Sequence, residues 1–163
     1  MSRAVKIIHI ALTATAWGIF TASLVRFIVV WGSLPENLGI HFASDGQFDM
    51  ISKKSYAAYP YIVTVAALAF FEIAALLSKK IKTGVKISEN GDLKIRAALK
   101  ILLDIFKLGF SFFFSGVWAD CVIRQRPLNT IIPAAVMLIM FLSFCAFAIA
   151  AIVIKVKNPP GRE

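Results

Sequence analysis

The sequence predicts an all-α integral membrane protein, a four-transmembrane-helix bundle with a short hairpin-like loop between the first two helices. Hydrophobic residues make up 59% of the chain and the mean hydropathy is +0.78, whereas soluble domains are about 45–50% apolar. The apolar residues gather into four runs, each long enough to cross about 30 Å of hydrocarbon as a helix of about 20 residues. We therefore expect one membrane domain that covers residues 1–163.

The predicted helices cover residues 7–31, 56–78, 97–123 and 131–155. No run shows the alternation of a membrane barrel strand, and each is about twice the length of such a strand, which is about 10 residues. The first run is too long for the apolar core of a signal peptide, about 7–15 residues, so we expect it to remain as an anchor. Two free thiols are expected, because Cys121 and Cys145 lie at different predicted depths.

Lys and Arg residues are divided unequally between the loops, and this predicts the orientation. Twelve of them lie in the N-terminal segment, between the second and third helices, and in the C-terminal tail, against four in the other two loops. The positive-inside rule therefore places both termini and the loop 79–96 in the cytoplasm, and the loop 32–55 outside. These juxtamembrane positions also explain the net charge of +9 by topology and anionic lipid, without a nucleic-acid partner.

Two of the loops carry signals for tight turns. Asp45-Gly46 lies between two short apolar segments of the outer loop and predicts a hairpin with a two-residue type I′ turn. Asn90-Gly91 predicts a second hairpin in the cytoplasmic loop. The alternative there is that the segment from Asp92 opens the third helix.

Five ionisable residues lie within or just inside the apolar runs, where a charge at a helix centre costs roughly 2.5–3.5 kcal/mol unless it is paired. At a rise of about 1.5 Å per residue, two of them can share a depth near the outer face and three near the inner face. The outer pair is Arg26 and Asp120, and the inner set is Glu72, Asp104 and Lys107. Two interpretations stay open: charge layers that fix helix register, or a path for protons or ions.

Several kinds of chemistry are not expected from this sequence. His9 and His41 fall at opposite ends of the first helix and its loop, no Ser or Cys has a base beside it, and no phosphate-binding Gly loop is present. We therefore expect no enzyme activity, no cofactor and no metal. A divalent cation held by His41, Asp45 and Asp49 is a weaker alternative to a hairpin in which these side chains cap turns and meet Lys53.

The outer loop contains a Pro before a His-Phe pair, a Gly five residues after the His, an Asp three further on, and a Ser-Lys before the next helix. In these features it resembles a bacterial membrane domain of unknown function, which also forms the N-terminal part of SdpI-like immunity proteins against the sporulation-delay toxin. Gly39 and Phe48 stand where members of that family often have Pro. The resemblance implies one structural or recognition unit, made of Pro35, His41, Phe42, Asp45, Gly46, Asp49 and Lys53.

The leading hypothesis is a non-enzymatic multi-pass protein of a bacterial cytoplasmic membrane. Its outer loop would recognise a peptide, a lipid or a membrane partner, and the resemblance implies immunity or signalling as the setting. Its partners would be the lipid bilayer and a peptide toxin or a membrane protein, with self-association as an open alternative. The second hypothesis is a small proton- or ion-coupled transporter that uses the charged interior.

Overall fold

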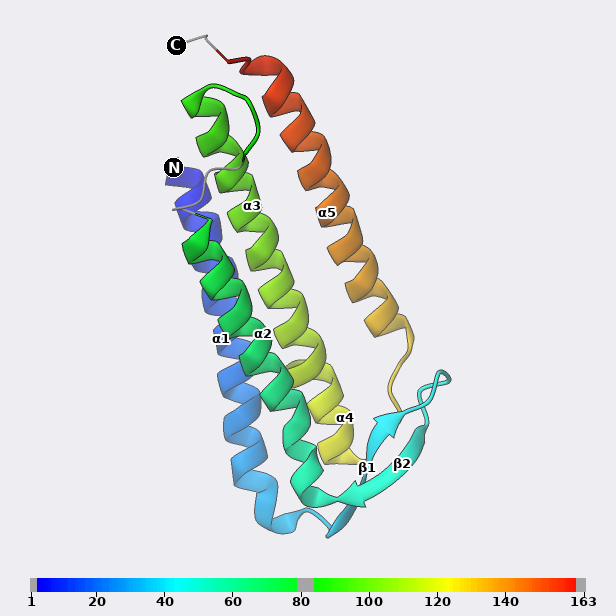
Figure 1. Ribbon diagram of the computed structural model, residues 1–163. Coiled ribbons are helices and arrows are strands. Elements are labelled where there is room, and N and C mark those ends of the chain that lie inside the picture. Colours follow the sequence, from blue (N-terminus) through cyan, green and yellow to red (C-terminus); the bar gives the residue numbers. More distant parts are fainter. Residues whose placement is uncertain (1–2, 79–83, 161–163) are drawn as a thin grey trace.

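The computed structural model describes residues 3–78 and 84–160 (Figure 1). Most of the chain is helical, and a small two-stranded sheet joins the first two long helices. The helices are α1 (Arg3–Val30), α2 (Tyr59–Leu77), α3 (Glu89–Phe110), α4 (Ala119–Arg124) and α5 (Ile131–Lys157). A π-helical segment, Ser111–Trp118, joins α3 to α4, short 3-10 helices cover Trp31–Ser33 and Lys54–Ala58, and the strands are β1 (Asn37–Phe42) and β2 (Phe48–Lys53).

The long helices form a bundle in which α3 packs against α1, α2 and α5 (Figure 1). Both chain ends lie at one end of the bundle, and the β-hairpin lies at the other. No side chain of α5 is buried, although the helix is almost entirely apolar. A helix that is hydrophobic all round and exposed in the isolated chain is suited to contact with lipid.

Three helical stretches of the described chain are long and apolar enough to cross a membrane: Arg3–Ser33, Lys54–Leu77 and Ile131–Lys157. They agree with the first, second and fourth predicted helices, and a membrane location is compatible with them. The third predicted helix is not among these stretches, because α3 carries Lys100, Asp104 and Lys107 along its length. These three side chains are buried in the bundle, so α3 presents its charges to its neighbours.

The predicted hairpin at Asn90-Gly91 is wrong. Helix α3 begins at Glu89, eight residues before the predicted start of the third helix, and Asn90-Gly91 lies in its first turn. Ser88 caps the helix, since its side chain accepts a hydrogen bond from the backbone N–H of Gly91 at 3.3 Å. Glu89 and Asp92 in the first turn add favourable charge near the helix N-terminus. Residues 79–83 of the predicted basic loop, with Lys79, Lys80 and Lys82, lie outside the described residues.

The hairpin predicted in the loop between the first two helices is confirmed, with β1 and β2 antiparallel from Asn37 opposite Lys53 to Phe42 opposite Phe48. Its predicted type I′ turn at Asp45-Gly46 is wrong. The turn runs from Ala43 to Gly46, with the N–H of Gly46 donating to the carbonyl of Ala43 at 2.9 Å. Gly46 has φ +83°, whereas among described residues other than glycine a positive φ occurs at Gln125 alone. Asp45 instead accepts a hydrogen bond from the backbone N–H of Gln47 at 2.9 Å, a local bond that favours this longer turn.

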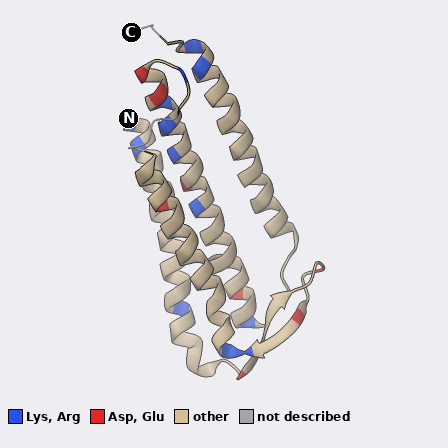
Figure 2. Cartoon of the chain, viewed as in Figure 1, with Lys and Arg blue, Asp and Glu red and all other residues tan. Residues whose placement is uncertain are grey.

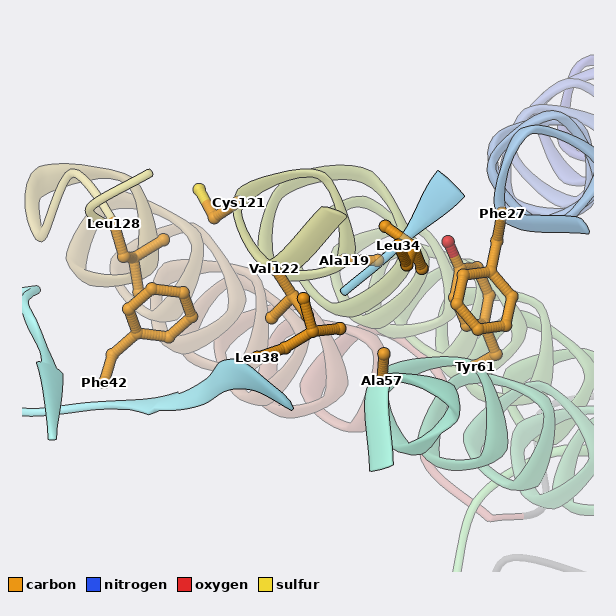
Figure 3. Packing of buried hydrophobic residues seen from close by; sticks show 10 residues of the cluster. All are labelled: Phe27, Leu34, Leu38, Phe42, Ala57, Tyr61, Ala119, Cys121, Val122 and Leu128. Atoms are coloured by element: carbon orange, nitrogen blue, oxygen red, sulfur yellow. The ribbon is translucent and has the colours of Figure 1, made fainter. Parts of the chain in front are cut away.

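The main apolar core of the bundle lies at the hairpin end, where side chains from the loop, α1, α2 and α4 meet (Figure 3). Leu34 and Leu38, from the loop and β1, are buried against Val122 of α4 and Ala57 ahead of α2. The loop between α1 and α2 is therefore a packed part of the fold. Both cysteines are free thiols, as predicted, and Cys121 belongs to this core. The core members are Phe27, Leu34, Leu38, Phe42, Ala57, Tyr61, Ala119, Cys121, Val122 and Leu128.

Candidate functional site

The β-hairpin, residues 37–53, forms a fixed platform at the end of the bundle, which we call the hairpin platform. The Gln125 side chain accepts from the N–H of Gly39 at 2.9 Å and donates to the carbonyl of Gly39 at 3.2 Å. Trp118 donates through Nε1 to the carbonyl of Ile40 at 3.2 Å, and the N–H of Leu128 donates to the carbonyl of Gly46 at 2.8 Å. Helix α3, the π-helical segment and α4 run on from one another over residues 89–124, and we call them the helical rod. Backbone groups of the hairpin are thus bonded to residues at the end of this rod and just after it.

The loop residues singled out in the sequence divide into packed and exposed ones. Phe42 is buried, stacks on Phe48 with ring centroids 4.5 Å apart, and meets Trp118 edge-on. Gly46 fits tightly, because a Cβ there would overlap the carbonyl oxygen of Leu128. Pro35 is exposed ahead of β1. Packing alone therefore explains why Phe42 and Gly46 stand at these two positions.

His41 and Asp49 form an exposed hydrogen-bonded pair across the two strands, with Nδ1 and Oδ1 2.6 Å apart. Asp45 does not join them, since its carboxylate is bonded within the turn. Lys53, expected beside these side chains, lies opposite Asn37, and the ion pair there joins Lys54 to Glu36 at 2.8 Å. The described residues bring no three His, Cys, Asp or Glu side chains together in a geometry suited to a metal ion.

An apolar groove of about 310 Å³ lies between the hairpin platform, α2 and the rod that ends at α4. Its walls are aliphatic and aromatic, and His41 brings its pair with Asp49 to the lining. On β2, Met50 lines this groove and its side chain is 52% exposed. The next residue, Ile51, is 74% exposed. The lining residues are Ile40, His41, Met50, Tyr56, Ala57, Tyr59, Pro60, Val63, Phe114, Trp118 and Val122.

The inner charged residues form one connected cluster, which we call the ion cluster. Lys107 Nζ lies 2.7 Å from Asp104 Oδ1 and 2.6 Å from Glu72 Oε2, and it donates to Thr13 at 2.9 Å. The side chains of Asp104 and Lys107 are fully buried, whereas that of Glu72 is 41% exposed. Three helices, α1, α2 and α3, therefore meet at these four side chains.

His9 completes the ion cluster, and reasoning from the sequence missed it. Its Nδ1 lies 2.7 Å from Asp104 Oδ2, so two carboxylates are balanced by Lys107 and by His9 when the imidazole is protonated. The sequence places His9 near the start of the first helix, at about the same depth as Asp104 of the third helix. The spacing of His9 and Thr13, four residues apart on one helix face, is the signal that could have found both.

Asp120 is the centre of the outer charged group. It pairs with Arg26 of α1, as the predicted depths allow, and also with Arg126 and with Arg124, whose Nε is 3.0 Å from Oδ1. One carboxylate thus contacts three guanidinium groups, from α1, from α4 itself and from the loop after α4. Arg124, the last residue of α4, is four residues from Asp120, and this spacing on one helix face is the sequence signal for their contact.

Buried hydroxyl groups lie between the two charged groups. Ser111 donates to the carbonyl of Ala16 at 2.6 Å, and Ser115 donates to Thr64 at 2.7 Å; all three hydroxyl-bearing side chains are fully buried. Both serines belong to the π-helical segment, and the rare π-turns inside α-helices often lie at functional sites. Polar side chains therefore follow the interface of α1, α2 and α3 along its length.

Comparison with protein-family models, with curated proteins and with solved structures finds no match for this chain.

Proposed function

We propose that the chain is a non-enzymatic protein of a bacterial cytoplasmic membrane, with four spans, both termini inside and the hairpin platform outside. Three apolar stretches support three of the spans. The fourth would be the helical rod from α3 to α4, whose buried charges are turned toward α1 and α2. The unequal division of Lys and Arg between the loops supports the orientation.

The proposed activity is recognition of a peptide or of a membrane-protein segment by the hairpin platform, in an immunity or signalling role. The observation that carries this proposal is the apolar groove beside the exposed pair of His41 and Asp49. The platform is held by side chains of the helical rod, so binding would not have to order it first, which lowers the entropic cost of association. An apolar side chain of the partner would enter the groove, and a polar group would meet the His-Asp pair.

Growth under challenge tests this proposal. A deletion strain is compared with strains that express the native protein, His41→Ala or Glu72→Gln, each exposed to a panel of membrane-active peptides. We expect native protein and Glu72→Gln to protect, and His41→Ala to lose protection at equal membrane abundance. Glu36→Gln, an exposed change ahead of the same strand, is the matched control. Protection that survives His41→Ala but fails in Glu72→Gln would overturn the assignment to the platform.

The ion cluster favours a second candidate function, proton- or ion-coupled transport. Fully buried charges inside a membrane bundle are costly and commonly mark ion paths, and Glu72 is the exposed member through which such a path would open. In proteoliposomes, Glu72→Gln would then abolish proton-coupled flux, whereas Lys155→Gln on exposed α5 would not. Equal flux in native protein and Glu72→Gln would exclude this candidate.

A further inference from the structure

A second cavity, of about 590 Å³, lies at the end of the bundle opposite the hairpin platform. Its walls come from the first turns of α1, from α3 and from Ser78 at the end of α2. The basic side chains in the lining are Lys6, His9, Arg96 and Lys100, and Ile10 and Leu93 are among the apolar ones. Figure 2 shows many of the Lys and Arg residues at this end of the bundle.

The lining of this cavity is rich in positive charge. Arg96 is paired with Asp92 at 2.5 Å, and His9 with Asp104 at 2.7 Å, so these two carboxylates are already engaged. Lys6, which is exposed, and Lys100 add two further cationic side chains to the walls. The site is therefore suited to an anion.

The position of the cavity favours a lipid as the source of that anion. Ile10 and Leu93 give the walls an apolar part, and the apolar stretch of α1 continues beyond Ile10. Cationic and apolar surface thus meet at one helix end, as at the boundary between headgroups and acyl chains. Basic cavities between membrane helices are a known form of site for anionic lipid headgroups, and guanidinium and ammonium groups match phosphate oxygens.

We propose that this cavity binds the phosphate headgroup of an anionic phospholipid, with Lys6, Arg96 and Lys100 as its cationic contacts. The bound headgroup would join α1 to α3 at the end of the bundle opposite the hairpin platform. It would also lie beside His9 and hence next to the ion cluster. This site is independent of the proposed recognition by the platform.

Native mass spectrometry and thermal unfolding of the purified full chain test the proposal. The protein is titrated with phosphatidylglycerol, with phosphatidylcholine of the same acyl chains, and separately with inorganic phosphate. We expect phosphatidylglycerol to bind at least about ten-fold more tightly than phosphatidylcholine, equivalent to about 1.4 kcal/mol, and to raise the unfolding temperature. Inorganic phosphate at millimolar concentration would not displace it.

Two double variants separate a site from general surface attraction. Lys6→Gln/Arg96→Gln removes two charges from the cavity, and Lys155→Gln/Lys157→Gln removes two from the end of α5. We expect the first pair to weaken phosphatidylglycerol binding about ten-fold more than the second, because only the first pair lines the cavity. General attraction, at about 1 kcal/mol for each charge near the surface, would weaken binding equally in both pairs. Lys6→Gln alone, on an exposed side chain, gives the same test if the double variant does not fold. Equal weakening by both pairs, or displacement by inorganic phosphate, would overturn the proposal.

Discussion

Lys107 is the residue on which the interior of the bundle depends most. It is fully buried, and its ammonium group contacts Asp104, Glu72 and Thr13. An unpaired buried charge is far more costly than a buried pair, because the remaining ion has lost both its hydration and its counter-ion. The ion cluster is therefore stable only as a complete set.

Replacement of Lys107 by Met is expected to destabilise the bundle by about 3–5 kcal/mol, because Asp104 then keeps only His9 as a partner and Glu72 loses its cation. The free energy of unfolding, measured by titration with dodecyl sulfate in mixed micelles, checks this. Asp104→Asn added to Lys107→Met should recover part of the loss. Lys155→Met on exposed α5 should change stability by less than about 0.5 kcal/mol. A Lys107→Met effect no larger than that of Lys155→Met would contradict a desolvated ion cluster.

Depth along the predicted helices is enough to bring Arg26 to Asp120, and Glu72 to Lys107, and both contacts form. The same reasoning misses His9, because a histidine is not counted among the charged side chains of the apolar runs. Gly39 has no explanation in the sequence alone. In the folded chain the Phe48 ring covers it, and a Cβ at Gly39 would overlap that ring.

At the scale of elements, the hairpin platform and the helical rod that ends at α4 behave as one unit. Gln125, the C-cap of α4, is held at φ 49° and uses both ends of its amide on Gly39. A left-handed conformation is unfavourable for a residue other than Gly, Asn or Asp, and two hydrogen bonds of about 0.5–1.5 kcal/mol each offset that cost. The amide of this one residue thus ties β1 to the rod.

Gln125→Asn should keep the left-handed conformation but draw the amide away from Gly39, because its side chain is one carbon shorter. We expect faster hydrogen exchange at Gly39 and its neighbours in β1, by about ten-fold for a loss near 1.4 kcal/mol, with unchanged exchange in α2. Gln47→Ala on the exposed turn is the matched control. Exchange in β1 that is the same in Gln125→Asn and Gln47→Ala would show that other contacts hold the platform.

Local turn signals predict one hairpin correctly and the other wrongly, for a reason that lies outside the turn itself. Asp45-Gly46 is flanked by segments that pair as β1 and β2 and pack on the core. Asn90-Gly91 follows Ser88, which caps a helix, and precedes a long segment with one buried face. The extended pairing partner that a second hairpin needs is thus taken up by helix α3. The π-helical segment has no clear sequence signature and was not predicted.

At the scale of the whole molecule, the two ends of the bundle differ in chemistry. One end carries the hairpin platform, an apolar core and an apolar groove, and the other carries both termini and the basic cavity. Hydropathy predicts the three most apolar helices because their side chains need no particular partner. The buried charges of α3 are stabilised by partners on α1 and α2. Hydropathy is summed along one segment and takes no account of partners on other helices.

The central claim, that the hairpin platform faces outward while the termini face the cytoplasm, is tested most directly by labelling single cysteines in intact cells. In a background with Cys121→Ala and Cys145→Ala, the single cysteine is introduced by Asp45→Cys in the platform turn or by Lys157→Cys at the end of α5. A membrane-impermeant maleimide should label position 45 in intact cells, and position 157 only after lysis. Label at position 157 in intact cells, with position 45 protected until lysis, would contradict the account.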